Sequence, residues 1–139
     1  MLNTALRFMS ECDRAGIKYR DSRDLDNGGS LVVCGVNGQN NARYDVLFLF
    51  DPDGKGVSPR VPGILTFPEE KRPQFLELVN ELNGKYRWVK FSLREGRVNM
   101  QADASITDDT SGRVCVELFL RIIKIIDDVY PEFMRTLWT

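Results

Sequence analysis

Acid–base and metal chemistry in proteins depends most often on one residue type that this sequence lacks. The 139-residue chain contains no histidine, which is the commonest general base, a member of the hydrolase triads and the main ligand of transition metals. Chemistry by carboxylates or by lysine stays open, so a small carboxylate- or lysine-dependent enzyme is an alternative hypothesis. The leading expectation is a protein without catalytic residues, cofactor or metal.

Two aspartate-rich segments look like the start of a calcium-binding loop. They read D-P-D-G-K-G at residues 51–56 and D-L-D-N-G at residues 24–28. Such a loop needs a bidentate glutamate at its twelfth position, but that position holds Pro62 in the first case and Gly35 in the second. Both segments are therefore predicted to be turns, which favour Asp, Asn, Pro and Gly for backbone reasons.

The adjacent carboxylates Asp108 and Asp109 do not have the facing geometry that an acid/base pair requires. They precede a long apolar segment and are predicted to cap the N-terminus of the last helix. The glycines form neither a G-x-x-x-x-G-K-[ST] motif nor a strand-linked G-x-G-x-x-G motif. The sequence therefore indicates no nucleotide-binding loop.

Aromatic and cationic side chains share one predicted strand face. Tyr86, Trp88 and Lys90 are expected to point away from the apolar set of that strand. Aromatic rings beside cations can stack the bases of single-stranded nucleic acid, so binding through the outer face of the 86–103 hairpin is an alternative hypothesis. The paired strand places amides and a carboxylate on that face, and this pattern favours a protein contact or a structural cover instead.

Charge, cysteines and apolar segments together predict a cytoplasmic protein that does not enter a membrane. The net charge is −1, so no strong field draws the chain to nucleic acid or to anionic lipid. The N-terminus lacks the pattern of a signal peptide, and charged residues interrupt the apolar stretch Val114–Val129. Cys12, Cys34 and Cys115 are odd in number and far apart, as expected of buried thiols in a reducing compartment.

A chain of this length can bury a core of ordinary size and is predicted to form one domain, residues 1–139. Apolar residues at helical spacing predict a first helix that ends at Gly16. Polar residues at 21–29 predict a turn. Apolar runs predict four strands, at residues 17–20, 31–36, 43–50 and 57–65. Pro59 and Pro62 remove hydrogen-bond donors from the last strand, which indicates an edge strand or a bulged one.

The segment 67–104 carries the clearest pattern in the chain. Apolar spacing predicts a helix that becomes regular near Pro73 and ends at Gly84. The period then changes to two, which predicts a hairpin that turns at Gly96. A shared apolar face requires the pairs Leu93–Val98, Phe91–Met100 and Val89–Ala102. A loop of two or four residues gives this register.

The last helix is predicted to begin between Asp108 and Ser111 and is apolar over a wide arc. Its apolar side chains span roughly 200° of the circumference, whereas a helix that rests on one surface shows a stripe of ~100°. The sheet and a second neighbour, either another helix or a second subunit, must therefore contact it. Pro131 is predicted to interrupt it.

Several segments resemble the bacterial YbjN family. The run P-E-E-K-R-P-Q-F-L-E-L-V-N-E-L-N at residues 68–83 is similar to the central helix of that family. The segments that follow are similar too: an aromatic strand at 86–93, a Glu95–Gly96 turn and a small-residue strand at 98–104. Residues 16–19 after the first helix and Tyr130–Pro131 extend the resemblance over nearly the whole chain.

The resemblance implies an α+β fold like that of type III secretion chaperones, with an antiparallel β-sheet and helices packed mainly on one face. The implied order of elements is α-β-β-β-β-α-β-β-α, with no catalytic residues and no cofactor. The family is described as sensory transduction regulators. We therefore expect a non-catalytic regulator or chaperone-like module that binds a protein partner and forms a homodimer, with Tyr86, Trp88 and Lys90 as contact residues.

Overall fold

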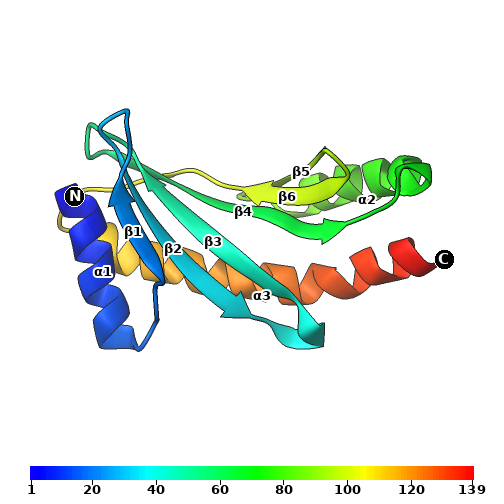
Figure 1. Ribbon diagram of the computed structural model, residues 1–139, viewed down its shortest axis with the longest axis horizontal. Helices are drawn as coiled ribbons and strands as arrows, with labels where there is room; N and C mark the ends of the chain where they lie inside the picture. Colours follow the sequence, from blue (N-terminus) through cyan, green and yellow to red (C-terminus); the bar gives the residue numbers. More distant parts are fainter.

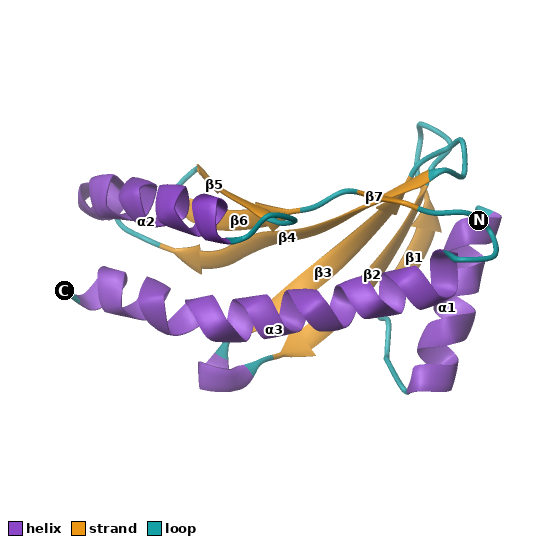
Figure 2. Cartoon of the chain, turned by 180° about the vertical axis from the view of Figure 1, so that it is seen from behind, coloured by secondary structure: helices purple, strands orange, loops and turns teal.

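The computed structural model describes residues 1–139 apart from the side chain of Asn41, and its fold is α+β. Seven strands form one antiparallel sheet in the order β1-β2-β3-β4-β6-β5, with the short β7 paired to β4. The helices lie on one face of this sheet (Figures 1 and 2). The predicted fold class and order of elements are confirmed, with β7 and two short 3-10 helices added.

The helices are α1 (Asn3–Ala15), α2 (Arg72–Lys85) and α3 (Ser111–Trp138), and the 3-10 helices are η1 (Gln39–Asn41) and η2 (Glu69–Lys71). The strands are β1 (Asp21–Asp24), β2 (Ser30–Asn37), β3 (Arg43–Phe50), β4 (Gly56–Thr66), β5 (Lys90–Arg94), β6 (Arg97–Gln101) and β7 (Ala104–Ser105).

Two clusters of aromatic rings lie in the core, and α3 carries one phenylalanine into each. Phe119 of α3 has its ring centroid 6.2 Å from that of Phe48 in β3. Further along α3, Phe133 lies 6.4 Å from Phe75 of α2 and 5.9 Å from Phe91 of β5, again between ring centroids. The long helix therefore joins the two ends of the sheet (Figure 2).

α1 supplies the second neighbour that the wide apolar arc of α3 requires. Ser111 Oγ donates a hydrogen bond to the carbonyl oxygen of Thr4 at 2.7 Å. A Cβ at Gly112 would lie 2.9 Å from the carbonyl oxygen of Arg7, so the close approach of the two helices requires glycine there. The predicted contact from two sides is confirmed for this part of α3.

The sequence predicts a strand at 17–20 and a turn at 21–29. The strand is wrongly placed, whereas residues 25–29 do form a turn, in which the N–H of Leu25 donates to the carbonyl oxygen of Gly29 at 2.8 Å. β1 occupies Asp21–Asp24, where Asp21 pairs with Val33 of β2. A strand at the edge of a sheet can keep charged side chains in water, and those charges also discourage pairing with another chain. The polar composition that indicates a turn is therefore compatible with an edge strand.

The sequence predicts that Gly84 ends α2 and that Pro131 interrupts α3, but both helices continue through these residues. α2 continues through Gly84 to Lys85 and ends where the N–H of Tyr86 donates to the carbonyl oxygen of Leu82 at 2.9 Å. α3 runs through Pro131. The next turn contains Phe133, which is fully buried, and core packing of this kind offsets the roughly 3 kcal/mol that an interior proline costs.

β4 is a central strand in spite of Pro59 and Pro62, and Pro62 lies within a β-bulge. The pairing of β4 with β6 shifts register within residues 61–65. Gly63 adopts a left-handed conformation with φ 63°, and its N–H donates to Asn99 Oδ1 at 2.7 Å. Of the two predicted alternatives for this strand, the bulged one is correct.

The β5–β6 hairpin has the register that its shared apolar face predicts. The predicted pairs Phe91–Met100 and Leu93–Val98 are present, and a two-residue loop connects Arg94 to Arg97. The third predicted pair, Val89–Ala102, lies outside the ladder because β5 begins at Lys90.

Asn83 near the end of α2 occupies the free edge of β5. Its Oδ1 accepts a hydrogen bond from the N–H of Phe91 at 2.7 Å, and its Nδ2 donates to the carbonyl oxygen of the same residue at 2.9 Å. The side chain therefore takes the place of a neighbouring strand and fixes α2 to the sheet.

We expect Asn83→Ala to lower the free energy of unfolding by about 2 kcal/mol, because it leaves both backbone groups of Phe91 without partners. The matched control is Asn80→Ala, which removes an exposed asparagine from the same helix and should change stability by less than about 0.5 kcal/mol. Urea unfolding measures both. Equal losses in the two variants would show that Asn83 does not hold the edge.

Glu95 and Gly96 form the hairpin turn with φ values of 52° and 72°. Two positive φ angles are the mark of a type I′ turn, for which Asn-Gly is preferred. Because the left-handed conformation costs glutamate roughly 1 kcal/mol, we expect Glu95→Asn to raise the unfolding free energy by about 0.5–1 kcal/mol. A neutral or destabilising result in urea unfolding would contradict this account of the turn.

Candidate functional site

A groove of about 370 Å³ lies between the end of α2 with the segment that follows it and one flank of α3. Residues 85–89 line one side, and Arg121, Lys124, Ile125 and Asp128 of α3 line the other. We name it the aromatic groove because Tyr86 and Trp88 both line it. Its wall is mostly apolar, and its charged groups stand at the rim.

The structure corrects the face on which Tyr86 and Trp88 are expected. Both residues precede β5, and both are half-buried against the core on the helix side of the sheet. The ring of Tyr86 meets that of Phe91 edge-on, with centroids 6.4 Å apart. Base stacking on the outer face of the hairpin would require these rings there, so the nucleic-acid hypothesis loses its structural basis.

Lys90 does not join the groove. Its Nζ donates hydrogen bonds to the carbonyl oxygens of Asn83 and Tyr86, at 3.3 Å and 3.4 Å. These carbonyls lie at the C-terminal end of α2, where a cation is favourable to the helix dipole. Lys90 is therefore a helix-capping residue, and two of the three predicted contact residues remain for a site.

The rim of the groove carries four cations and one carboxylate. Arg121 pairs with Glu117 at 2.9 Å and Lys124 pairs with Asp128 at 3.6 Å, each within α3. Lys85 has its Nζ 5.4 Å from the ring centroid of Tyr86, which is a cation–π distance. Among the described side chains, no ion pair involves Lys85 or Arg87.

Sequence reasoning missed the α3 side of the groove, which includes Ile125. More than thirty residues separate it from Trp88 in the chain, and no motif spacing connects them. The available signal is the wide apolar arc of α3, which shows that its flanks need neighbours without saying which segments supply them.

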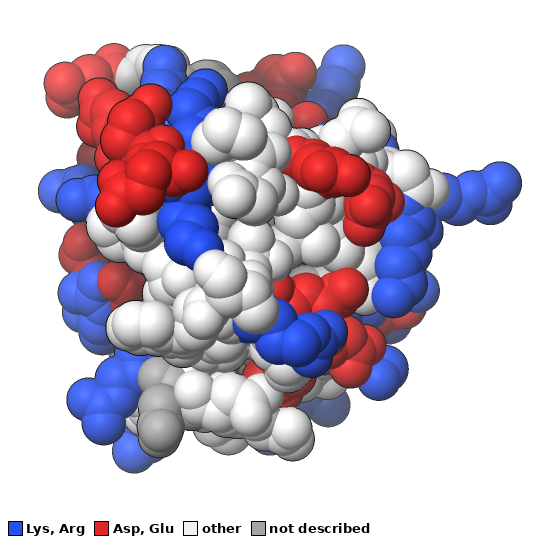
Figure 3. All heavy atoms as spheres, turned by 90° about the vertical axis from the view of Figure 1, so that its right-hand side faces the viewer, with Lys and Arg blue, Asp and Glu red and all other residues white. Residues whose placement is uncertain are grey.

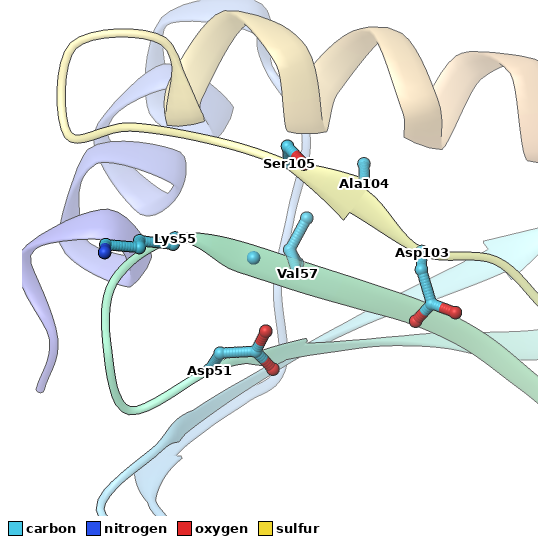
Figure 4. A pocket seen from close by; sticks show the side chains of 7 residues that line it. Asp51, Lys55, Val57, Asp103, Ala104 and Ser105 are labelled. Atoms are coloured by element: carbon cyan, nitrogen blue, oxygen red, sulfur yellow. The ribbon is translucent and has the colours of Figure 1, made fainter.

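A second hollow contains two carboxylates, from Asp51 and Asp103, near the start of β4 (Figure 4). It is open to solvent, and the side chain of Lys55 points away from both carboxylates. The Asp51 carboxylate lies against Gly56, where a Cβ would collide with it. Within the described residues no group of three or more potential metal ligands comes together, and Asp51 belongs to the turn between β3 and β4.

The three cysteines lie in the core, as the sequence predicts. Cys12 of α1, Cys34 of β2 and Cys115 of α3 are free thiols and fully buried. Burial raises the pKa of Cys115 to about 12. Because the thiolate is the nucleophilic form, this thiol is inert at neutral pH.

A line of side chains runs along the flank of α3 that faces away from the aromatic groove. Successive members of this line are alternately four and three residues apart in the sequence. This α3 seam consists of Val116, Leu120, Ile123, Asp127, Tyr130, Met134 and Leu137, all half-buried except Leu120, which is 57% exposed. Figure 3 shows a broad area of uncharged residues at the end of the molecule where α3 finishes.

In the part of the chain that the structure describes, no helix is long and apolar enough to cross a membrane.

Comparison with known proteins identifies a family. The YbjN family model, described as a putative bacterial sensory transduction regulator, matches residues 13–135. This range includes every residue that lines the aromatic groove, and it confirms the family resemblance seen in the sequence. No curated protein and no solved structure gives a significant match, so the likeness to type III secretion chaperones stays a prediction.

Proposed function

Because the chain belongs to the YbjN family, we propose that it is a non-catalytic regulator that binds a protein partner through the aromatic groove. The observation that carries this proposal is the half-buried surface of Tyr86, Trp88 and Ile125 beneath a cationic rim. Aromatic residues are enriched at protein-binding hot spots because they bury a large area.

The charges at the rim indicate the chemistry of the partner. Arg121 and Lys124 have carboxylates beside them on α3, whereas Lys85 and Arg87 do not form ion pairs with any described side chain. A partner segment with an aliphatic or aromatic side chain between acidic residues would fill the apolar wall and balance these charges. Holding such a segment is also compatible with a chaperone-like role.

Fluorescence anisotropy with two labelled peptides tests this proposal. One peptide carries Leu and Phe between glutamates, and the other carries the same pair between lysines. We expect the acidic peptide to bind at low salt and the Lys85→Glu/Arg87→Glu variant to bind it about tenfold more weakly, since exposed charge contacts are worth roughly 1 kcal/mol each at most.

The control for this test is Arg23→Glu/Arg43→Glu, which reverses two exposed cations outside the groove with the same change in net charge. Its affinity for the acidic peptide should stay close to that of the unmodified protein. Equal weakening in both variants, or tighter binding of the lysine peptide, would contradict a specific acidic-segment site.

We also propose that the α3 seam joins two copies of the chain. A seam of apolar residues with a 3.5-residue period is the surface that one helix presents to another, and the same seam on a second copy gives a two-fold contact. Asp127 is the one charged member, and its Oδ1 accepts the N–H of Gln39 at 3.1 Å. It therefore has a partner within the chain.

Sedimentation at micromolar concentration tests the homodimer. We expect a dimer for the unmodified protein and a monomer for Leu120→Glu, because the substitution places a charge at the most exposed apolar residue of the seam. Leu76→Glu is the matched control, since Leu76 is 47% exposed on α2, and it should leave the dimer intact. A monomeric unmodified protein would contradict this contact.

The cytoplasm is the compartment that we propose for this protein. The three cysteines are buried as free thiols, which suits a reducing environment.

A further inference from the structure

The helix-free face of the sheet (Figure 1) contains a hollow of about 220 Å³ over β4, β5 and β6. We name it the arginine hollow. Its polar lining consists of Arg60 from β4, Ser92 and Arg94 from β5, and Asn99 and Gln101 from β6. It lies outside the aromatic groove and shares no lining residue with it.

The charge on this part of the sheet has one sign. The outward positions paired in these three strands include Arg60, Arg94 and Arg97, and none of the paired residues is Asp or Glu. The ammonium group of Lys90 is not counted here because it is directed to the end of α2. Within the described side chains, none of the three arginines forms an ion pair. Glu95 belongs to the hairpin turn, and Asp103 lies beyond the end of β6.

Arg94 and Arg97 lie directly opposite each other across the hairpin. Like charges in a cross-strand pair are destabilising, so this arrangement works against the local stability of the hairpin. Positions at which a sequence breaks a local rule without structural compensation are expected at functional sites.

The hollow also contains oriented neutral donors. Asn99 Oδ1 accepts the N–H of Gly63 at 2.7 Å, which fixes the orientation of the amide and leaves its Nδ2 as a donor. Arg60 uses its Nε to donate to Ser58 Oγ at 3.3 Å, so its two terminal nitrogens remain for a ligand. The β-bulge within residues 61–65 shapes this wall, and such bulges are common beside functional sites.

We propose that the arginine hollow binds a phosphate-class oxyanion, either free phosphate or the phosphate group of a small soluble molecule. The planar guanidinium groups of Arg60 and Arg94 can each donate two parallel hydrogen bonds to such an oxyanion. Ser92, Asn99 and Gln101 supply further donors between them. The site has the volume for one such group and does not depend on the protein-binding role of the aromatic groove.

Titration followed by amide NMR shifts tests the proposal, with inorganic phosphate and phosphoserine as separate probes at constant ionic strength. We expect shifts confined to β4, β5 and β6, and an affinity reduced roughly tenfold or more in Arg60→Gln/Arg94→Gln, which removes two charge-assisted contacts. Tighter binding of phosphoserine than of phosphate would identify a phosphorylated small molecule as the ligand, and the reverse would identify free phosphate.

The matched control is Arg23→Gln/Arg43→Gln, which removes two exposed arginines outside the hollow and should leave the affinity unchanged. Thermal unfolding separates binding from folding, because Arg94→Gln removes a repulsive pair and should not destabilise the hairpin. Equal shifts with chloride, equal affinity in both double variants, or binding of an oligonucleotide or anionic vesicles without binding of either small probe would overturn the proposal.

Discussion

The architecture depends on the burial of α3 along its whole length. Phe119 and Phe133 are fourteen residues apart on one helix, roughly 21 Å, and each lies in a different aromatic cluster. The helix therefore spans the sheet. It fixes the distance between the end of the sheet that α1 covers and the end that α2 covers. The same constraint explains why α3 continues through Pro131, since interrupting it would expose the second cluster.

The burial of α3 also determines which surfaces stay available. Its groove-side flank meets residues 85–89 without closing over them, which leaves the aromatic groove as an apolar surface with a charged rim. Its other flank keeps the α3 seam half-exposed.

The two edges of the sheet are protected in different ways. The edge of β5 is filled by Asn83, and the edge of β1 carries charged side chains. The surfaces on the two faces of the sheet therefore differ in chemistry: an apolar groove on the helix side and an arginine hollow on the open side.

Much of the fold could be predicted from local pattern. The alternation in the β5–β6 hairpin predicts the observed Phe91–Met100 pairing because a slip of one residue would expose its whole apolar face. The pattern fails where tertiary contacts decide the outcome. β1 is polar and becomes a strand because β2 offers it hydrogen bonds, and Gly84 stays helical because α2 is tied to β5 by Asn83.

The candidate site shows the same division between local and distant information. Tyr86 and Trp88 can be selected from the sequence as unusual residues, but they precede β5, so the alternation of the strand does not determine which way their side chains point. Arg121 and Lys124 carry no sign of a site in the sequence, because charges on a long helix are ordinarily solvated. Recognition of an acidic segment needs desolvated aromatic surface and cations at the same place, and only the packing of α3 against residues 85–89 brings the two together. The aromatic groove therefore combines apolar and cationic groups that lie far apart in the sequence.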